Sequence, residues 1–257
     1  MRRSLLVGAA LMAVSLSNGA FAADAKISVP AGVAAAVADA GRPETDKARD
    51  GGRHPAESVA FAGIKAGDKV ADLLPGGGYF TRIFAKVVGD KGKVFAINPE
   101  PRQPPSPEQL QRAEAFKAAM ASAYPNVTVM AANLADLKVP EPLDVAWTSL
   151  NYHDLKNIPN FDIVAFNKAV LASLKPGGTY IVIDHAAEKG SGARDTSTLH
   201  RIDADLVRQE VLSAGFVLDG SSDVLAQPGD NHSGKVFDAD MRGKTDQFLL
   251  KFKKPAK

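Results

Sequence analysis

The chain has 257 residues, of which 45% are hydrophobic and 23% charged, a composition that suits a globular protein with room for one α/β domain. Residues 1–22 hold two of the 31 basic residues and none of the 29 acidic ones, so the remaining chain is close to neutral and has no basic footprint for nucleic acid. The absence of cysteine excludes disulfides, thiolate metal sites and a cysteine nucleophile.

Residues 1–22 predict a cleavable signal peptide. Arg2 and Arg3 precede an apolar run over residues 5–16, and residues 20–22 (AFA) form an A-x-A cleavage site. The apolar run is too short to span a bilayer comfortably, so no stable membrane anchor is expected. The predicted location is the periplasm. The arginine pair resembles a twin-arginine export signal, and an ordinary secretory signal is the alternative.

Residues 23–257 are expected to form one domain, which begins with a helical segment over residues 23–67. An alanine- and valine-rich stretch in this segment ends at Pro43, and Pro55 marks the start of a helix. Arg53 and His54 precede that proline, and they either close a pocket or lie on the surface.

From residue 68 onward, apolar strands alternate with helices, which favours a parallel sheet with helices on both faces. The predicted strands are residues 69–74, 93–97, 127–131, 143–149, 179–184, 216–225 and 247–252. The predicted helices are residues 79–88, 108–123, 161–174 and 204–214. The polar, glycine-bearing stretch 226–245 is expected to be a loop near the site.

The turn Pro75-Gly76-Gly77-Gly78 separates the first strand from a helix that begins at Tyr79. Glycines let a ligand approach the backbone closely, and the helix start offers free N–H groups and a positive dipole end. Tyr-Phe-Thr follows the turn instead of Lys-Ser or Lys-Thr, which disfavours a nucleoside triphosphate. A dinucleotide site would need a third glycine after the turn. The turn therefore indicates a nucleotide-like ligand of another kind.

Residues 72–78 (DLLPGGG) resemble the first motif, D-x-G-x-G-x-G, of class I S-adenosylmethionine-dependent methyltransferases. Gly76 and Gly78 match, whereas Leu74 replaces the first glycine. Residues 174–178 (LKPGG) resemble the turn before strand five in that family, and the likeness covers roughly residues 55–255. Segments 53–55 (RHP), 151–154 (NYHD) and 199–203 (LHRID) look like a group of exported predicted methyltransferases.

The resemblance implies a Rossmann-like doubly wound sheet of about seven strands, mostly parallel with an antiparallel closing strand. It also implies S-adenosylmethionine as cofactor, with its methionine part at the glycine turn and its adenine beside Asn133 and Leu134. Asn98 stands where the family has a ribose-binding acid, and Glu100 is expected to substitute. The predicted cofactor-binding residues are Asp72, Pro75, Gly76, Gly77, Gly78, Tyr79, Asn98, Glu100, Asn133, Leu134 and Asn151.

Polar residues follow the fourth strand, where ligands of such a sheet bind. The predicted catalytic residues are Tyr152, His153, Asp154 and His200. His153 is expected to accept a proton from a substrate, and Asp154 to orient it. The alternative is structural: Asn151 and Asp154 cap a turn, Tyr152 packs, and Asp203 after His200 caps a helix.

Two other kinds of site are not expected. No H-x-x-x-H or H-E-x-x-H spacing occurs, so no metal site is predicted, and one would have to be assembled from distant loops. No G-x-S-x-G occurs, which disfavours a serine hydrolase.

The leading functional prediction is an exported S-adenosylmethionine-dependent methyltransferase that acts on a small or peptidic acceptor. The alternative is a non-catalytic binding or maturation protein that retains the fold. Leu74 and Asn98 favour the alternative, and so does the doubtful supply of S-adenosylmethionine outside the cytoplasm.

Overall fold

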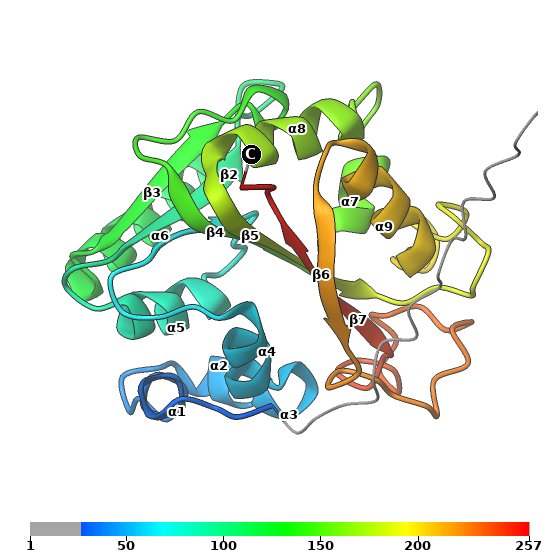
Figure 1. Ribbon diagram of the computed structural model, residues 1–257, viewed down its shortest axis with the longest axis horizontal. Coiled ribbons are helices and arrows are strands. Elements are labelled where there is room, and N and C mark those ends of the chain that lie inside the picture. Colours follow the sequence, from blue (N-terminus) through cyan, green and yellow to red (C-terminus); the bar gives the residue numbers. More distant parts are fainter. Residues whose placement is uncertain (1–26, 257) are drawn as a thin grey trace, which may run out of the picture.

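The computed structural model describes residues 27–256, so the predicted signal peptide lies outside the described part. Seven strands form one sheet. They are β1 (Lys69–Leu73), β2 (Lys93–Pro99), β3 (Val127–Ala132), β4 (Leu143–Ser149), β5 (Leu174–His185), β6 (Val217–Ser222) and β7 (Gln247–Lys253). Their order is β3-β2-β1-β4-β5-β7-β6, and the first five are parallel while β7 runs antiparallel to both β5 and β6 (Figure 1). The predicted fold class is confirmed.

The helices cover both faces of the sheet (Figure 1). They are α1 (Ala31–Val37), α2 (Glu44–Lys47), α3 (Asp50–Arg53), α4 (Pro55–Ala62), α5 (Tyr79–Val88), α6 (Pro107–Ala123), α7 (Tyr152–Lys156), α8 (Ile163–Ser173) and α9 (Ala204–Ser213), with a short 3₁₀ turn η1 (Leu134–Asp136). None of the helices in residues 27–256 has the length and apolarity needed to span a bilayer.

Each face of the sheet has its own core because successive strand residues point to opposite sides. Val145 and Trp147 of β4 pack with α1, α4 and α5, whereas Ala146 between them packs with α8 and α9. The central strand β1 is buried along Val70–Leu73, as expected for a parallel strand that is covered on both faces. The sheet is therefore rigid where its strands end, and those ends position the site.

Side-chain caps fix the starts of several helices. Ser106 and Gln109 form a capping box at α6, with Pro107 at the first helical position. Asp162 accepts from the backbone N–H of Ala165 at α8, and Asp203 caps α9 as its alternative reading predicted. These caps explain why the predicted and observed starts of these helices agree within two residues.

Two strand boundaries differ from the prediction by three residues or more, and one helix was not predicted. β5 begins at Leu174, five residues early, because Leu174 pairs with Leu143 and the next residues form a bulge before Thr179 pairs with Val145. β6 ends at Ser222 instead of residue 225. β4 is followed by the short helix α7, which the sequence did not predict because five residues are too few to show a helical period.

The N-terminal helices are tied to the sheet by a buried ion pair. The guanidinium of Arg42 donates to both carboxylate oxygens of Asp50, at 2.8 and 2.7 Å, and the Arg42 side chain is fully buried. Asp50 also accepts from the hydroxyl of Tyr79 at the start of α5. The pair therefore holds α3 against the glycine turn.

Candidate active site

The carboxyl ends of β1 and β4 both carry a leucine in the left-handed region. Leu74 has φ of 55° and Leu150 has φ of 60°. This conformation costs a non-glycine residue roughly 1–2 kcal/mol, so both positions are strained. Leu74 therefore adopts a backbone conformation that glycine takes without strain.

Asn151 holds the Leu74 turn. Its amide donates to the carbonyl oxygens of Leu74 at 3.0 Å and Leu73 at 3.4 Å, and its side-chain oxygen accepts from the hydroxyl of Thr148. Both ends of the Asn151 amide are thus engaged by protein. Asn151, predicted to bind cofactor, thus positions the turn and also lines the cavity beside it.

A cavity of about 240 Å³, the glycine-turn cavity, lies between the exits of β1 and β4. It is lined by Arg49, Arg53, Asp72, Leu74, Pro75, Gly76, Gly77, Tyr79, Phe80, Ser149, Leu150 and Asn151. Five predicted residues besides Asn151 are thereby brought together: Asp72, Pro75, Gly76, Gly77 and Tyr79.

The three glycines of the turn have different roles. A Cβ on Gly76 or Gly77 would meet no atom within 4 Å, so these two leave open space at the cavity. A Cβ on Gly78 would lie 2.8 Å from Met120 and 2.9 Å from Phe116 of α6. Gly78 is absent from the cavity lining, and the close approach of α6 explains its glycine.

Asp72 ends β1 at the base of the cavity. Its carboxyl group is buried and accepts from the hydroxyl of Thr81 at 2.5 Å. Burial raises the pKa of Asp72 to about 7, against smaller opposing effects of Thr81, Arg53 and Arg82. A cation in the cavity would stabilise the ionised carboxylate.

Arg53 supplies a positive charge to the same cavity. Its guanidinium lies 4.6 Å from the ring centre of Tyr79 and 5.8 Å from that of Phe80. Within residues 27–256 this guanidinium has no hydrogen bond or ion pair to a protein group, and burial lowers its pKa. Arginine binds carboxylates with bidentate geometry, so this position suits an anionic ligand group. Of the two open interpretations of Arg53, the pocket one matches the structure.

A second cavity of about 280 Å³ lies at the exits of β2 and β3. It is lined by Pro99, Glu100, Pro101, Arg102, Ala132, Asn133, Leu134, Ile158 and Phe161. The predicted residues Glu100, Asn133 and Leu134 are thus brought together, while Asn98 lies one residue before the lining. A carboxylate beside apolar side chains suits a ligand with both hydroxyl groups and an aromatic ring.

His153, Asp154 and His200 form a third group, the histidine cluster, after β4. His153 Nε2 lies 3.3 Å from His200 Nδ1 and 3.3 Å from Asp154 Oδ1, and His200 Nδ1 lies 3.5 Å from Asp154 Oδ1. His153 Nδ1 contacts Asp184 Oδ1 at 2.8 Å. Burial opposes a charge on His153, yet Asp184 and Asp154 outweigh it and raise the pKa of His153 to about 10. A raised pKa favours the protonated ring, which weakens His153 as a general base.

Tyr152 lies away from the other predicted catalytic residues. Its side chain is fully buried in the core on the face of α8 and α9. The hydroxyl donates to Glu210 at 3.0 Å and accepts from Asn167 at 2.8 Å, and burial raises its pKa. The packing alternative describes Tyr152.

The loop between β6 and β7 is anchored beside His200. Arg201 and Asp230 form a buried ion pair through contacts of 2.8 and 3.1 Å, and Arg201 also donates to the carbonyl of Gly234 at 2.9 Å. The Phe237 ring lies 4.7 Å from the ring of His200. Sequence reasoning missed this pair, because its members are 29 residues apart and only the contact reveals them.

The N-terminal segment connects the glycine-turn cavity with the cluster side of the sheet. The charge of Arg53 lowers the pKa of both Asp72 and His185, although burial is the main cause of the low His185 pKa of about 4. Gln247 donates to the carbonyl of Gly52 at 3.3 Å, which joins α3 to β7.

Sequence reasoning also missed Asp184. Its position as an acidic residue at the end of a predicted apolar strand could have indicated it.

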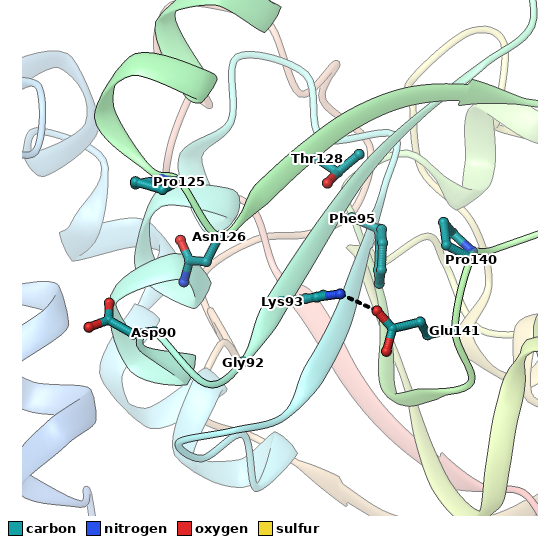
Figure 2. A pocket seen from close by; sticks show the side chains of 9 residues that line it. All are labelled: Asp90, Gly92, Lys93, Phe95, Pro125, Asn126, Thr128, Pro140 and Glu141. Atoms are coloured by element: carbon teal, nitrogen blue, oxygen red, sulfur yellow. Dashed lines mark hydrogen bonds and ion pairs between the residues drawn. The ribbon is translucent and has the colours of Figure 1, made fainter.

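A larger cavity of about 460 Å³, whose lining residues are drawn in Figure 2, lies at the amino ends of strands β2 and β3. It is formed by the starts of β2 and β3 and by Pro140 and Glu141. Lys69 and Lys93 both donate to Glu141 and lower its pKa to about 2. Ligands of parallel α/β sheets bind at the carboxyl ends of the strands, so size does not make this cavity the site.

No protein-family model and no curated protein matches the chain. Among solved structures, a SAM-dependent methyltransferase from Aquifex aeolicus is 20% identical over 82% of this chain and 98% of its own, with a TM-score of 0.56. The [4+2]-cyclase SpnF is 19% identical over 85% of each chain, with a TM-score of 0.57. An arsenic(III) S-adenosylmethionine methyltransferase from Chlamydomonas reinhardtii is 19% identical over 89% of this chain and 74% of its own, with a TM-score of 0.53.

At these identities the likeness concerns the fold. It confirms the predicted resemblance to class I S-adenosylmethionine-dependent methyltransferases at the level of architecture. A fold that is shared by two methyltransferases and a cyclase does not fix the reaction, which has to be argued from the site.

Proposed function

We propose that the chain binds S-adenosylmethionine at the carboxyl edge of its sheet and transfers the methyl group to a small or peptidic acceptor. One glycine-lined cavity holds both the Arg53 guanidinium, which has no partner among residues 27–256, and the buried Asp72 carboxyl, and this observation carries the proposal. The amino-acid end of the cofactor carries one carboxylate and one ammonium. The cavity offers the Arg53 guanidinium for the carboxylate, and the ammonium would stabilise the ionised form of the Asp72 carboxyl.

The residues of the two cavities fit the rest of the cofactor. Gly76 and Gly77 leave open space that side chains would fill. Glu100 in the second cavity is a hydrogen-bond acceptor for ribose hydroxyls, and Leu134 and Phe161 are apolar neighbours for an adenine ring.

Bound S-adenosylmethionine would supply an electrophilic methyl group on a positively charged sulfur. The task of the chain is to hold the reactants in line and to exclude water between them. Orientation of this kind lowers the activation free energy by up to ~7–11 kcal/mol. The rigid strand ends and the turn held by Asn151 suit this task, because they leave little freedom at the cavity.

The predicted acceptor side is the histidine cluster. His153 and Asp154 follow the same strand that lines the glycine-turn cavity, and His200 faces them from the segment before α9. A neutral amine acceptor needs no base, whereas a hydroxyl acceptor does. The carboxylates of Asp154 and Asp184 favour a proton on His153, so acceptors that need no base suit this cluster best.

A binding or maturation protein is the second candidate function. Leu74 in the motif and Asn98 at the ribose position favour it. This candidate retains the fold and the cavities but transfers no methyl group. Cofactor binding alone does not separate the two, so an acceptor-dependent release of S-adenosylhomocysteine is the discriminating signal.

Calorimetry of the chain with S-adenosylmethionine and S-adenosylhomocysteine tests cofactor binding. Gly77→Val is the informative variant, because Gly77 is outside the left-handed region and its Cβ would enter open space. We expect a ~10- to 100-fold loss of affinity from the added volume. Gly229→Val is the matched control, since a Cβ there is equally unobstructed in an exposed turn of another loop. Absence of binding by the unaltered chain at millimolar ligand would refute the proposal.

We also propose export to the periplasm, on the basis of the A-x-A site at residues 20–22. N-terminal sequencing of the protein from a periplasmic fraction is expected to begin at Ala23. Recovery of the chain with Met1 from the cytoplasm alone would contradict export.

A further inference from the structure

The histidine cluster has the geometry of a metal site. Three candidate ligand atoms, His153 Nε2, His200 Nδ1 and Asp154 Oδ1, form a triangle with sides of 3.3, 3.3 and 3.5 Å. Ligands at ~2.0–2.1 Å from a tetrahedral Zn²⁺ lie about 3.3–3.4 Å apart. Adjacent ligands of an octahedral ion at ~2.1 Å lie about 3.0 Å apart, so the triangle matches one face of a tetrahedron more closely.

The hydrogen bond at the far side of the His153 ring supports the same reading. Asp184 Oδ1 lies 2.8 Å from His153 Nδ1, and Asp184 Oδ2 accepts from the His153 backbone N–H at 2.8 Å. Donation from Nδ1 to a carboxylate leaves Nε2 with a lone pair that points at the cluster, and metal-binding histidines are commonly oriented in this way. Asp184 and His153 are both buried, so this orientation is fixed.

Charge and strain also favour a cation. The carboxylates of Asp154 and Asp184 both lie against His153, and the negative field that favours a proton there favours a divalent cation for the same reason. His200 has φ of 56°, a strained conformation that aims its ring at the other two ligands. Hydrogen bonds among two histidines and one aspartate would require neither the second carboxylate at His153 nor the strained backbone of His200.

We propose that His153, His200 and Asp154 bind one Zn²⁺ ion and leave its fourth position open. The side chains of Asp154 and His200 are 50% and 32% exposed, so a small molecule reaches the fourth position from solvent. Three protein ligands with one open position are typical of catalytic zinc. The chemical class that fits is water or an anionic oxygen or sulfur of a small molecule. This inference goes beyond the proposed methyl transfer and does not require the cofactor to bind.

Metal content and affinity of the full chain, prepared without a histidine tag and stripped by chelator, test the proposal. We expect one Zn²⁺ per chain by elemental analysis after equilibration with Zn²⁺ alone. Co²⁺ in place of Zn²⁺ is expected to give the intense visible absorption of a tetrahedral centre. The weak absorption of an octahedral centre, or no Zn²⁺ binding at micromolar concentration, would overturn the assignment.

Two variants and one matched control locate the ion. His200→Ala and Asp154→Asn are each expected to weaken Zn²⁺ binding at least ~100-fold, more than changes to outer residues do. His232→Ala is the control, because His232 is also left-handed, with φ of 62°, is 28% exposed, and contacts a carboxylate of Asp246 at 2.9 Å. It should bind Zn²⁺ as the unaltered chain does. Asp154→Asn keeps the shape of a half-exposed side chain, so the test survives if His200→Ala fails to fold. Unchanged affinity in Asp154→Asn would refute the site.

Discussion

The glycine-turn cavity and the histidine cluster lie at the same edge of one sheet, yet they are built in different ways. The cavity is shaped by backbone: Leu74, Gly76 and Gly77 come from one continuous turn, and Asn151 fastens it. The cluster is made of side chains from two segments, α7 and the stretch before α9, which are 47 residues apart. A contiguous turn leaves a signature in the sequence, whereas an assembled cluster does not.

The two regions also differ in what keeps them in place. The cavity is closed by the N-terminal helices through the Arg42–Asp50 pair, which retains partial contact with solvent at Asp50. The cluster rests on the Arg201–Asp230 pair, in which both side chains are fully buried. Four measurements test this difference between the cavity and the cluster, from the largest expected change in free energy to the smallest.

Arg201→Ala should have the largest effect on stability. Removing Arg201 leaves the buried Asp230 carboxylate without an opposite charge and with only the backbone N–H groups of His232 and Asp246 as donors. Loss of one partner of a buried ion pair typically costs about 3–5 kcal/mol of unfolding free energy. Denaturant unfolding followed by circular dichroism measures the loss. Arg208→Ala is the control, because its pair with Asp205 is about 40% exposed at each side chain and should contribute no more than ~0.5 kcal/mol. Equal losses in the two variants would show that the buried pair is not the anchor of the loop.

Asp72 should make the stability of the chain depend on pH. The pKa of Asp72 is raised by burial from the ordinary 3.8 to about 7, so the folded state holds a proton that the unfolded state has lost. Its contribution to stability is therefore full below pH 4 and falls as the pH rises to 7, by up to about 4 kcal/mol. Asp72→Asn should remove this dependence. Parallel pH profiles of unfolding free energy for the two proteins would contradict the burial of an unpaired carboxyl.

Arg53→Ala should weaken the binding of S-adenosylmethionine by roughly 1.5–3 kcal/mol, about 10- to 100-fold, through the loss of charge-assisted hydrogen bonds. Calorimetry measures the affinity, and Arg112→Ala on the exposed face of α6 is the control. Arg53→Lys should recover only part of the loss, because an ammonium lacks the bidentate fork. An affinity insensitive to Arg53→Ala would place the ligand carboxylate elsewhere.

Leu74 offers the smallest and most local test. Glycine adopts a left-handed backbone freely and alanine does not, so Leu74→Gly should be more stable than Leu74→Ala by about 1 kcal/mol. Leu110 in α6 is the control, because in a helix the order reverses and the glycine variant is the weaker by about 1 kcal/mol. Thermal unfolding of the four variants checks both orders. If Leu74→Ala is instead more stable than Leu74→Gly, the backbone at position 74 is not held in the left-handed conformation.

The sheet and most of the cavity were open to prediction because their signals are local. Alternating apolar strands and helices gave seven strands near their observed positions, and the turn at residues 75–78 marked the cavity. Two details of the cavity depend on contacts between segments that are distant in sequence. Gly78 faces Met120 of α6, which no spacing reveals, and Arg53 reaches the cavity only because α3 folds back over it.

The cluster was only partly predictable. His153, Asp154 and His200 were chosen as chemical candidates, and the structure places them together. Tyr152 is adjacent to His153 in sequence, which makes it a catalytic candidate. Successive residues of a helix point to different sides, however, and the Tyr152 side chain packs in the core. The expectation of no metal rested on short histidine spacing. Such spacing cannot detect ligands that two separate segments contribute.

The position of β7 has a consequence for the order in which the protein folds. β7 is the last strand within the described residues 27–256, yet it lies between β5 and β6 and pairs with both. β6 therefore has no partner in the sheet until residues 247–253 have been synthesised and inserted. The parallel part of the sheet, β1 to β5, can form earlier from residues already available. During synthesis, β6 and its following loop thus wait for β7, and the part of the sheet next to the histidine cluster is completed after the part next to the glycine-turn cavity.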